Sequence, residues 1–379
     1  MTAFIGLGLL TQTALVLTDL YFVSHLGARA MAGVSAAATT LFLGMATAQI
    51  ISIGALSLLS QSFGARDFAN ARLVFSQACA LGCMAGVCAL ALGYSLGPLA
   101  VNALSADAST SAAGRAYLFA LTPGLACMFP AAALSAGLRA GGMVGAPMLA
   151  QSLTVAVNIA LAPLLIGGWG YGLNLGPAGA GLATSIATIA GVGALSAVFY
   201  ARQPHLRLSR SDMTLHWRVI GRLAKIGLPA GGEFAVAFVI TGFVYGVLRE
   251  FGPATQAGYG VGSRVMQAVF VPAMALALGV APIAGQNYGA GYGHRVRETL
   301  HHALLMGGSL MLALTLVCQV SPDILVRPFT SDHRTAAVAA GYLRILSWHF
   351  IASGVILICT GVFQALSQTL LPCSAARAG

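Results

Sequence analysis

The chain has 379 residues, of which 58% are hydrophobic and only 7% are charged. An ordinary soluble domain carries roughly 25% charged residues. So few charges could not solvate the surface of a soluble protein of this length. The composition therefore excludes a soluble globular domain and predicts an integral membrane protein.

Apolar segments of about 20 residues or more recur along the chain. As a helix rising ~1.5 Å per residue, each is long enough to cross a hydrocarbon layer of ~30 Å. The 47 glycines suit helices that pack closely in a membrane. The predicted spans are residues 2–24, 33–61, 74–104, 115–138, 146–168, 177–201, 227–250, 255–286, 303–326 and 336–366.

Basic residues are shared unequally between the two sets of connecting segments. If the N-terminus is cytoplasmic, the cytoplasmic segments contain Arg66, Arg72, Arg139, Arg202, Arg207, Arg210, Arg218, Arg222, Lys225, Arg295, Arg297 and Arg377. The opposite segments contain only Arg29, Arg115, Arg249, Arg327 and Arg334. This bias predicts a multi-pass protein of the cell inner (plasma) membrane with a cytoplasmic N-terminus. It also explains most of the formal charge of +10, so we expect no nucleic-acid partner.

A short motif recurs at a fixed distance. The sequence QSFGA, which begins at Gln61, reappears as QNYGA from Gln286 onward, an offset of 225 residues (286 − 61 = 225). At the same offset, Arg72 matches Arg297, Ala140 matches Ala365 and Pro147 matches Pro372. This repeat predicts two similar halves, related as parallel repeats because an even number of spans separates them.

The repeat also predicts the domain organisation. We expect an N-lobe of helices 1–6 at residues 1–201, a cytoplasmic linker at 202–226 and a C-lobe of helices 7–10 at 227–379. The counterparts of the fifth and sixth N-lobe spans would fall beyond Gly379. The expected fold is therefore all-α, with two pseudo-symmetric helical bundles. The first bundle would have six helices and the second about four of an original six. We thus expect a twelve-helix architecture that is shortened at both ends.

These motifs, in this order, resemble those of the multidrug and toxic compound extrusion (MATE) family. The sequence TDLYFV from Thr18 is similar to the first-helix signature, and the two repeated motifs are similar to those after the second and eighth helices. The likeness continues through Gly137-Leu138-Arg139, Pro147, Asn158, Pro177 and Gly181-Leu182-Ala183-Thr184. It covers essentially the whole chain. It implies two lobes in a V around a central cavity, and export of organic cations or other amphiphiles coupled to inward H⁺ or Na⁺.

Two carboxylates, Asp19 and Glu233, lie clearly within predicted spans. A charge there costs on the order of 2.5–3.5 kcal/mol or more, and it usually marks an ion or proton pathway. Asp19 corresponds to the coupling acid of the MATE family, and the resemblance adds Asn158 and Thr184 as polar neighbours. The alternative for Asp19 is a carboxylate that caps a neighbouring hydroxyl or a helix end. The alternative for Asn158 is a packing hydrogen bond between helices, worth ~0.6–2 kcal/mol.

Glu233 is the candidate coupling residue of the C-lobe. It follows Pro229 by four residues and so shares its helix face; a half-buried acid at the cytoplasmic end is the alternative. Arg264, alone in the eighth span, needs a partner or a water-filled cavity. We expect a structural or gating role for Arg264, Pro229, Gln61 and Gln286.

The function that we favour is a monomeric secondary antiporter. It would export small organic cations or other amphiphilic drugs in exchange for H⁺ or Na⁺, in contact with membrane lipid and without a cofactor or a metal site. The alternatives are a flippase for lipid-linked precursors, with only Arg264 to hold a phosphate, and an inactive shortened transporter. No nucleophile elbow, HExxH motif or phosphate-binding loop occurs, so we do not expect an enzyme.

Overall fold

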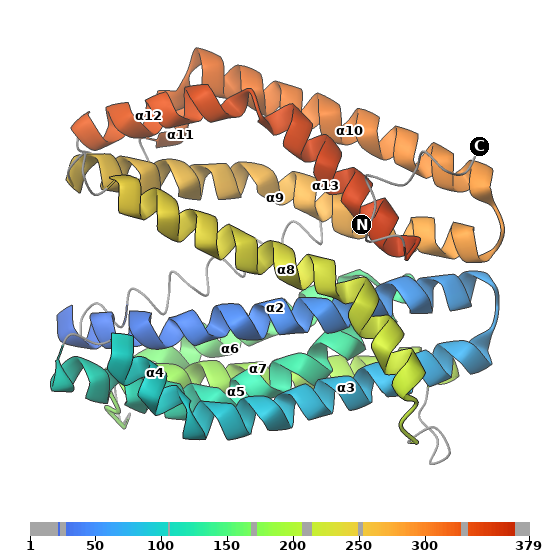
Figure 1. The fold of residues 1–379 in the computed structure, drawn as a ribbon, viewed down its shortest axis with the longest axis horizontal. Coiled ribbons are helices and arrows are strands. Elements are labelled where there is room, and N and C mark those ends of the chain that lie inside the picture. The colour runs from blue at the N-terminus through green and yellow to red at the C-terminus, as the bar shows by residue number, and fades with distance from the viewer. Residues whose placement is uncertain are drawn as a thin grey trace.

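The computed structural model describes residues 22, 28–104, 107–167, 173–206, 214–248, 253–326 and 333–367. Within these ranges the regular structure is helical, without strands. A helix satisfies its backbone hydrogen bonds within one segment, as a hydrocarbon layer requires. The helices form two bundles, one from each half of the chain, with α8 crossing between them (Figure 1). This confirms the predicted all-α fold of two pseudo-symmetric bundles.

The N-lobe is built around α5, which packs against α2, α3 and α7. Asp67 caps α3 and Asp107 caps α5, each by accepting a backbone hydrogen bond in the first turn. Phe75 and Phe199 stack 4.6 Å apart in its core. The N-lobe helices are α2 (Ala28–Gly64), α3 (Phe68–Ser95), α4 (Gly97–Leu104), α5 (Ala108–Ala140), α6 (Gly145–Ile166) and α7 (Pro177–Arg202).

The C-lobe is built around α9, which packs against α10, α12 and α13. The buried core of this lobe includes Val265, Met311, Leu343 and Phe350. The C-lobe helices are α8 (Trp217–Leu248), α9 (Pro253–Gly289), α10 (Gly293–Val320), α11 (Pro322–Val326), α12 (His333–Ser347) and α13 (Phe350–Ala365).

The last predicted span, 336–366, is broken rather than continuous, because α12 and α13 meet at an angle of 59°. Backbone carbonyls freed at the bend are satisfied by α10. Thr315 donates to the Ser347 carbonyl at 3.0 Å, and Gln319 donates to the Arg344 carbonyl at 2.7 Å. Side chains of a neighbouring helix thus make the bend compatible with an apolar environment.

The helices reproduce the predicted spans from 33–61 onward, with differences at their ends. Short helices, α4 and α11, follow breaks in the spans 74–104 and 303–326. The span 2–24 lies outside the described residues except for Phe22. Within the described ranges, seven helices are long and apolar enough to cross a membrane, or eight if α12 and α13 count as one span.

Helix α8 begins at Trp217, ten residues before the predicted span (227 − 217 = 10), so it includes the end of the expected linker 202–226. Gln77, buried in α3, accepts a hydrogen bond from the His216 backbone and donates to the Thr214 carbonyl, at 2.8 and 2.9 Å. These bonds fix the start of α8 against the N-lobe. From there α8 packs mainly along α2 rather than α9.

One end of the molecule collects most of the described basic residues. It holds the ends of α2, α5, α7 and α9 and the starts of α3, α6, α8 and α10, and we call it the basic end. The hairpins α2–α3 and α9–α10 meet there, at the right of Figure 1. Its basic residues include Arg66, Arg72, Arg139, Arg202, Arg218, Arg222, Lys225, Arg295 and Arg297.

Candidate functional site

A polar pair lies between α6 and α7, inside the N-lobe. Asn158 is completely buried, and its Nδ2 donates to Thr184 Oγ1 at 3.2 Å. The Thr184 hydroxyl in turn donates to the Ala180 carbonyl at 3.0 Å. Because the hydroxyl hydrogen is used in this way, the amide group must present its NH₂ to Thr184. Among the described residues, Asn158 Oδ1 is then left buried without a hydrogen-bond partner.

An unpaired buried acceptor is rare, because leaving it so costs ~1–3 kcal/mol. The pair lies away from the basic end, where α6 starts. Asn158 is only eight residues from the opposite end of α6 (166 − 158 = 8), about 12 Å along the helix. The free oxygen can accept a proton-bearing group or ligate a hard cation, which prefers oxygen ligands. The pair that the family resemblance suggested is therefore brought together.

The described part of the first predicted span lies near this pair. Phe22 is half-buried and packs against a cluster that contains Ala162 and Ala180. These alanines lie one helical turn from Asn158 and Thr184 respectively. Asp19, the predicted coupling acid, lies outside the described residues.

A second site joins the two lobes at the basic end. Gln61 Nε2 on α2 donates to the Ala365 carbonyl at 2.7 Å, and Gln286 Nε2 on α9 donates to the Ala140 carbonyl at 2.5 Å. Both the donors and the acceptors are 225 residues apart (286 − 61 and 365 − 140). Each lobe thus gives the other the same hydrogen bond. We call these two bonds the inter-lobe contact.

Glycines allow the same two motifs to touch through their backbones. A Cβ added at Gly64 would overlap the Gln286 carbonyl, and one added at Gly289 would overlap the Gln61 carbonyl. The two glycines are also 225 residues apart (289 − 64). This reciprocity is what a pseudo-two-fold axis between the lobes produces. The repeat in the sequence is therefore a repeat in space, with its axis at the inter-lobe contact.

The remaining predicted site residues lie on the C-lobe. Glu233 is exposed on α8 and makes no hydrogen bond or ion pair within the described ranges. Pro229 is half-buried inside the same helix. Arg264 lies in α9, and its side chain is outside the described part of the structure. The structure does not bring Glu233 beside Asn158 and Thr184.

The predicted position of Arg139 is wrong. It was assigned to a cytoplasmic connecting segment, but it lies in the last turn of α5 and is only 8% exposed. Its guanidinium donates to Ser52 on α2 at 2.5 Å, while its Nε has no partner in the part of the chain that the structure describes. The apolar neighbours Leu138 and Ala140 were the signal that the helix continues. Arg139 directly precedes the Ala140 carbonyl of the inter-lobe contact.

Across the described residues, no group of three or more His, Cys, Asp or Glu side chains could hold a metal ion. The functional features that the structure describes are instead a buried polar pair in one lobe and a symmetric contact between the lobes. Together with the long apolar helices, this defines a membrane protein of two pseudo-symmetric lobes.

Comparisons with known proteins specify the family. The MatE family model matches residues 5–164 and 229–377. The chain is 26% identical over 376 residues to the probable multidrug resistance protein YpnP of Bacillus subtilis, covering 97% of this chain and 81% of that protein. It is 23% identical over 367 residues to the multidrug export protein MepA of Staphylococcus aureus, covering 96% and 79%.

A solved structure shares the fold. An outward-facing conformation of a multidrug resistance MATE family transporter of the MOP superfamily superposes with a TM-score of 0.87 at 20% identity, covering 97% of this chain and 82% of that one. The chain belongs to the MatE family of multidrug efflux transporters, and the predicted family is confirmed.

Proposed function

We propose that the chain is a secondary antiporter that exports organic cations or other amphiphilic drugs in exchange for H⁺ or Na⁺. Asp19, Asn158 and Thr184 would form its coupling site. The observation that supports this most is the buried Asn158 Oδ1, which has no donor among the described residues. Such an oxygen is suited to an ion that binds and leaves in each cycle.

Either coupling ion would satisfy this oxygen. With H⁺, a protonated Asp19 would donate its O–H to Asn158 Oδ1. With Na⁺, the Asp19 carboxylate and Asn158 Oδ1 would both ligate the cation. Binding also neutralises an acid whose charge costs on the order of 2.5–3.5 kcal/mol or more within the membrane. Ion binding would therefore favour one arrangement of the N-lobe over the other.

The basic end would face the cytoplasm of a plasma-membrane protein, because basic segments remain on that side. In the structure the lobes touch at this end, through Gln61 and Gln286. Such a conformation would be closed to the cytoplasm. Alternating access would then require both bonds of the inter-lobe contact to break together.

The C-lobe residues would act on the gating movement rather than at the N-lobe pair. Pro229 removes one helical hydrogen bond from α8 and permits bending. Glu233 lies one turn further on and is exposed. We propose a contribution of Glu233 to coupling, and a structural or gating role for Arg264.

The test is ethidium accumulation in pump-deficient cells that express the chain or its Asp19→Asn variant, with membrane insertion verified by immunoblotting. We expect lower accumulation with the chain and cell-background accumulation with Asp19→Asn. Equal export by both would contradict a coupling role for Asp19. If the chain inserts but accumulation equals the background, the drug-export proposal fails, and a flippase for lipid-linked precursors or an inactive chain remains.

A further inference from the structure

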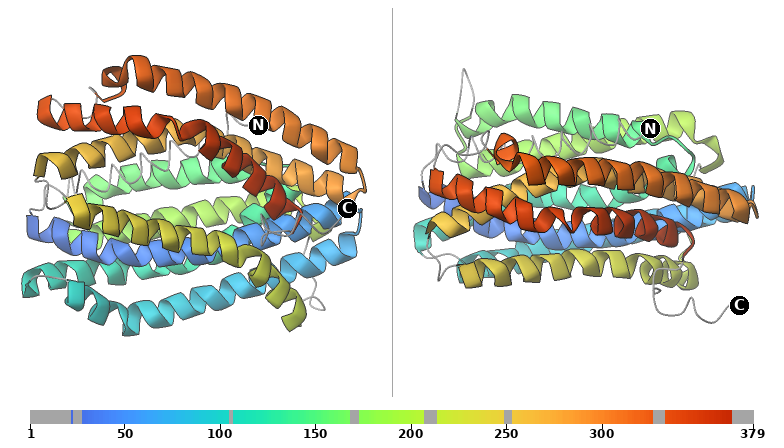
Figure 2. Two further views of the ribbon diagram at one scale, coloured as in Figure 1. Left: turned by 45° about the horizontal axis from the view of Figure 1, so that its top comes forward. Right: turned by 90° about the horizontal axis from the view of Figure 1, so that it is seen from above.

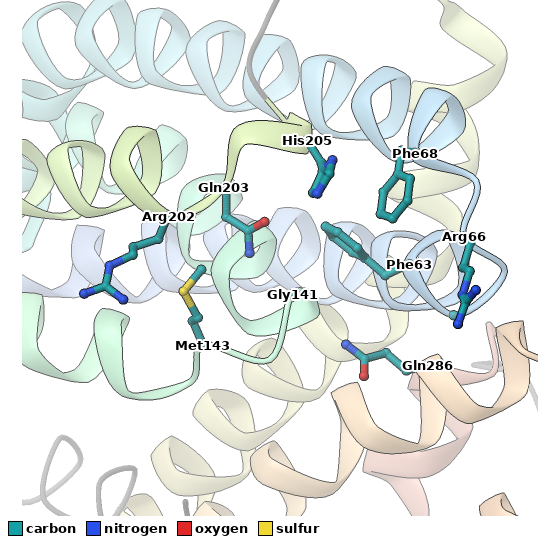
Figure 3. A pocket seen from close by; sticks show the side chains of 10 residues that line it. Phe63, Arg66, Phe68, Gly141, Met143, Arg202, Gln203, His205 and Gln286 are labelled. Carbon is teal, nitrogen blue, oxygen red and sulfur yellow. The ribbon is translucent and has the colours of Figure 1, made fainter.

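Two hollows of the N-lobe adjoin at the basic end. One is a polar pocket of about 430 Å³ between the α2–α3 turn, the α5–α6 turn and the end of α7 (Figure 3). The other is an apolar groove of about 780 Å³ along α6 and α7. Met143 and Arg202 line both hollows. The site therefore has an apolar part and a polar part, and each has a volume typical of small-molecule sites, ~300–1,000 Å³.

The groove runs along two helices that are each long and apolar enough to cross a membrane. Helices α6 and α7 form one edge of the molecule, on the opposite side from α8 in the view from above (Figure 2). Leu149 and Leu153 form one wall, with exposed fractions of 64% and 42%. Ala194 and Ala197 form the other, and their small side chains leave the groove open. From Arg202 to Ala194 the groove follows α7 for eight residues (202 − 194 = 8), about 12 Å.

The polar pocket is suited to an anion. Arg66 and Arg202 lie at its opposite sides, with His205 near Phe68 between them (Figure 3). The His205 ring stacks on Phe68 at 4.4 Å, which holds its position. None of the described residues that line the pocket is acidic.

A side-chain amide also faces the pocket. Gln203 lines the pocket and makes no side-chain hydrogen bond within the described ranges. Most of the residue is buried, with 5% exposed, but its amide atoms are not among the fully buried atoms that lack a partner. They are therefore accessible from the pocket, where a ligand can bond to them.

We propose that an anionic phospholipid of the cytoplasmic leaflet binds here, with an acyl chain along α6 and α7 and its headgroup in the polar pocket that Arg66, Arg202 and His205 line. Basic pockets between membrane helices on the cytoplasmic side bind anionic headgroups. A free phosphate would use only the polar pocket. The adjoining apolar groove has room for an acyl chain, which favours a lipid over a free anion.

The site also touches the inter-lobe contact. Gln286 of the C-lobe lines the polar pocket while it donates to the Ala140 carbonyl. When the lobes part, the pocket loses this wall. A ligand shifts an equilibrium by its differential affinity for the two states, so the bound lipid favours the conformation that is closed at the basic end.

The test is native mass spectrometry of the purified full chain, titrated with phosphatidylglycerol or with phosphatidylcholine of the same acyl chains. We expect one phosphatidylglycerol to bind about tenfold more tightly than phosphatidylcholine. The Arg66→Gln/Arg202→Gln variant loses this preference. The control, Arg218→Gln/Arg222→Gln, removes two exposed charges of the same end outside the pocket and keeps the preference.

A second pair of variants tests the groove. Ala197→Phe fills it and weakens retention of phosphatidylglycerol, whereas Ile189→Phe, at an exposed position of α7 outside the groove, does not. Equal affinity for both lipids, or unchanged preference in Arg66→Gln/Arg202→Gln, overturns the proposal. So does displacement of phosphatidylglycerol by glycerol 3-phosphate at equal concentration, because the pocket is then a site for a free anion.

Discussion

Thr184 and Thr188 lie one turn apart on α7, and each hydroxyl donates to the carbonyl four residues before it. Thr184 differs in that it also accepts the amide hydrogen of Asn158. At the scale of single residues, the candidate coupling site is thus a hydroxyl that orients an amide, and an amide oxygen that is left free.

This difference gives a matched pair of variants. Thr184→Val removes the acceptor of Asn158 Nδ2, so the buried amide loses its only described partner, at a cost of ~1–3 kcal/mol. We expect drug export at the same expression level to fall about tenfold or more, since ~1.4 kcal/mol corresponds to tenfold. Thr188→Val makes the same chemical change one turn away and should export like the unmodified chain. Equal export by both variants would show that the amide needs no orientation by Thr184.

At the scale of elements, the bend between α12 and α13 depends on α10. Thr315, which is buried, donates to the Met311 carbonyl of its own helix and to the Ser347 carbonyl at the bend. No intrahelical bond can replace the second one, since the chain changes direction there. The bend is therefore fixed by a hydroxyl on another helix.

We expect Thr315→Val to destabilise the C-lobe by ~1–3 kcal/mol, because the Ser347 carbonyl is left unsatisfied in an apolar environment. Thr299→Val is the control, as Thr299 bonds only to the Arg295 carbonyl within α10. The measurement is the melting temperature in detergent, followed by tryptophan fluorescence. If the two variants have the same melting temperature, the bend is held by packing alone.

The close contact between helices α2 and α9 offers a second test at this scale. A Cβ at Gly64 would overlap the Gln286 carbonyl, so Gly64→Ala should push the two helices apart at a cost of ~1–3 kcal/mol, as for other overpacked sites. Gly308→Ala is the control, because a Cβ there meets no atom within 4 Å. Melting temperatures of the two variants in detergent should differ by several degrees. An unchanged melting temperature in Gly64→Ala would mean that the lobes are not held this closely in solution.

At the scale of the whole molecule, the lobes are joined by the same hydrogen bond made twice. Gln61→Leu/Gln286→Leu removes both bonds and should increase the share of molecules open at the basic end. Spin labels on the exposed residues Ala69 of α3 and His294 of α10 report this, since each lobe carries one. We expect a longer, broader distance distribution in the double variant.

Asn287→Leu is the control for this experiment, because Asn287 donates only within α9, to the Ile283 carbonyl. Its distance distribution should match that of the unmodified chain. If the double variant also leaves the distribution unchanged, the inter-lobe contact does not hold the basic end closed.

The class of protein, the spans from 33–61 onward and the internal repeat could all be predicted from the sequence. Membrane thickness imposes a minimum length on every apolar helix, so the spans from 33–61 onward could be predicted from composition alone. The 225-residue offset between Gln61 and Gln286 indicated two similar halves, since a duplicated structure keeps its landmarks in the same order. The same offset matches Ala140 to Ala365, whose carbonyls accept the two bonds of the inter-lobe contact.

Which of these residues meet, and how they bond, depends on how the helices pack in three dimensions. Gln61 reaches Ala365, and Gln286 reaches Ala140, across hundreds of residues of sequence, and periodicity carries no information on such contacts. Whether Asn158 is satisfied depends on Thr184 on another helix, and the burial of Arg139 depends on Ser52 of α2. These outcomes depend on distances between side chains of different helices, which are set by packing rather than by hydrophobic pattern.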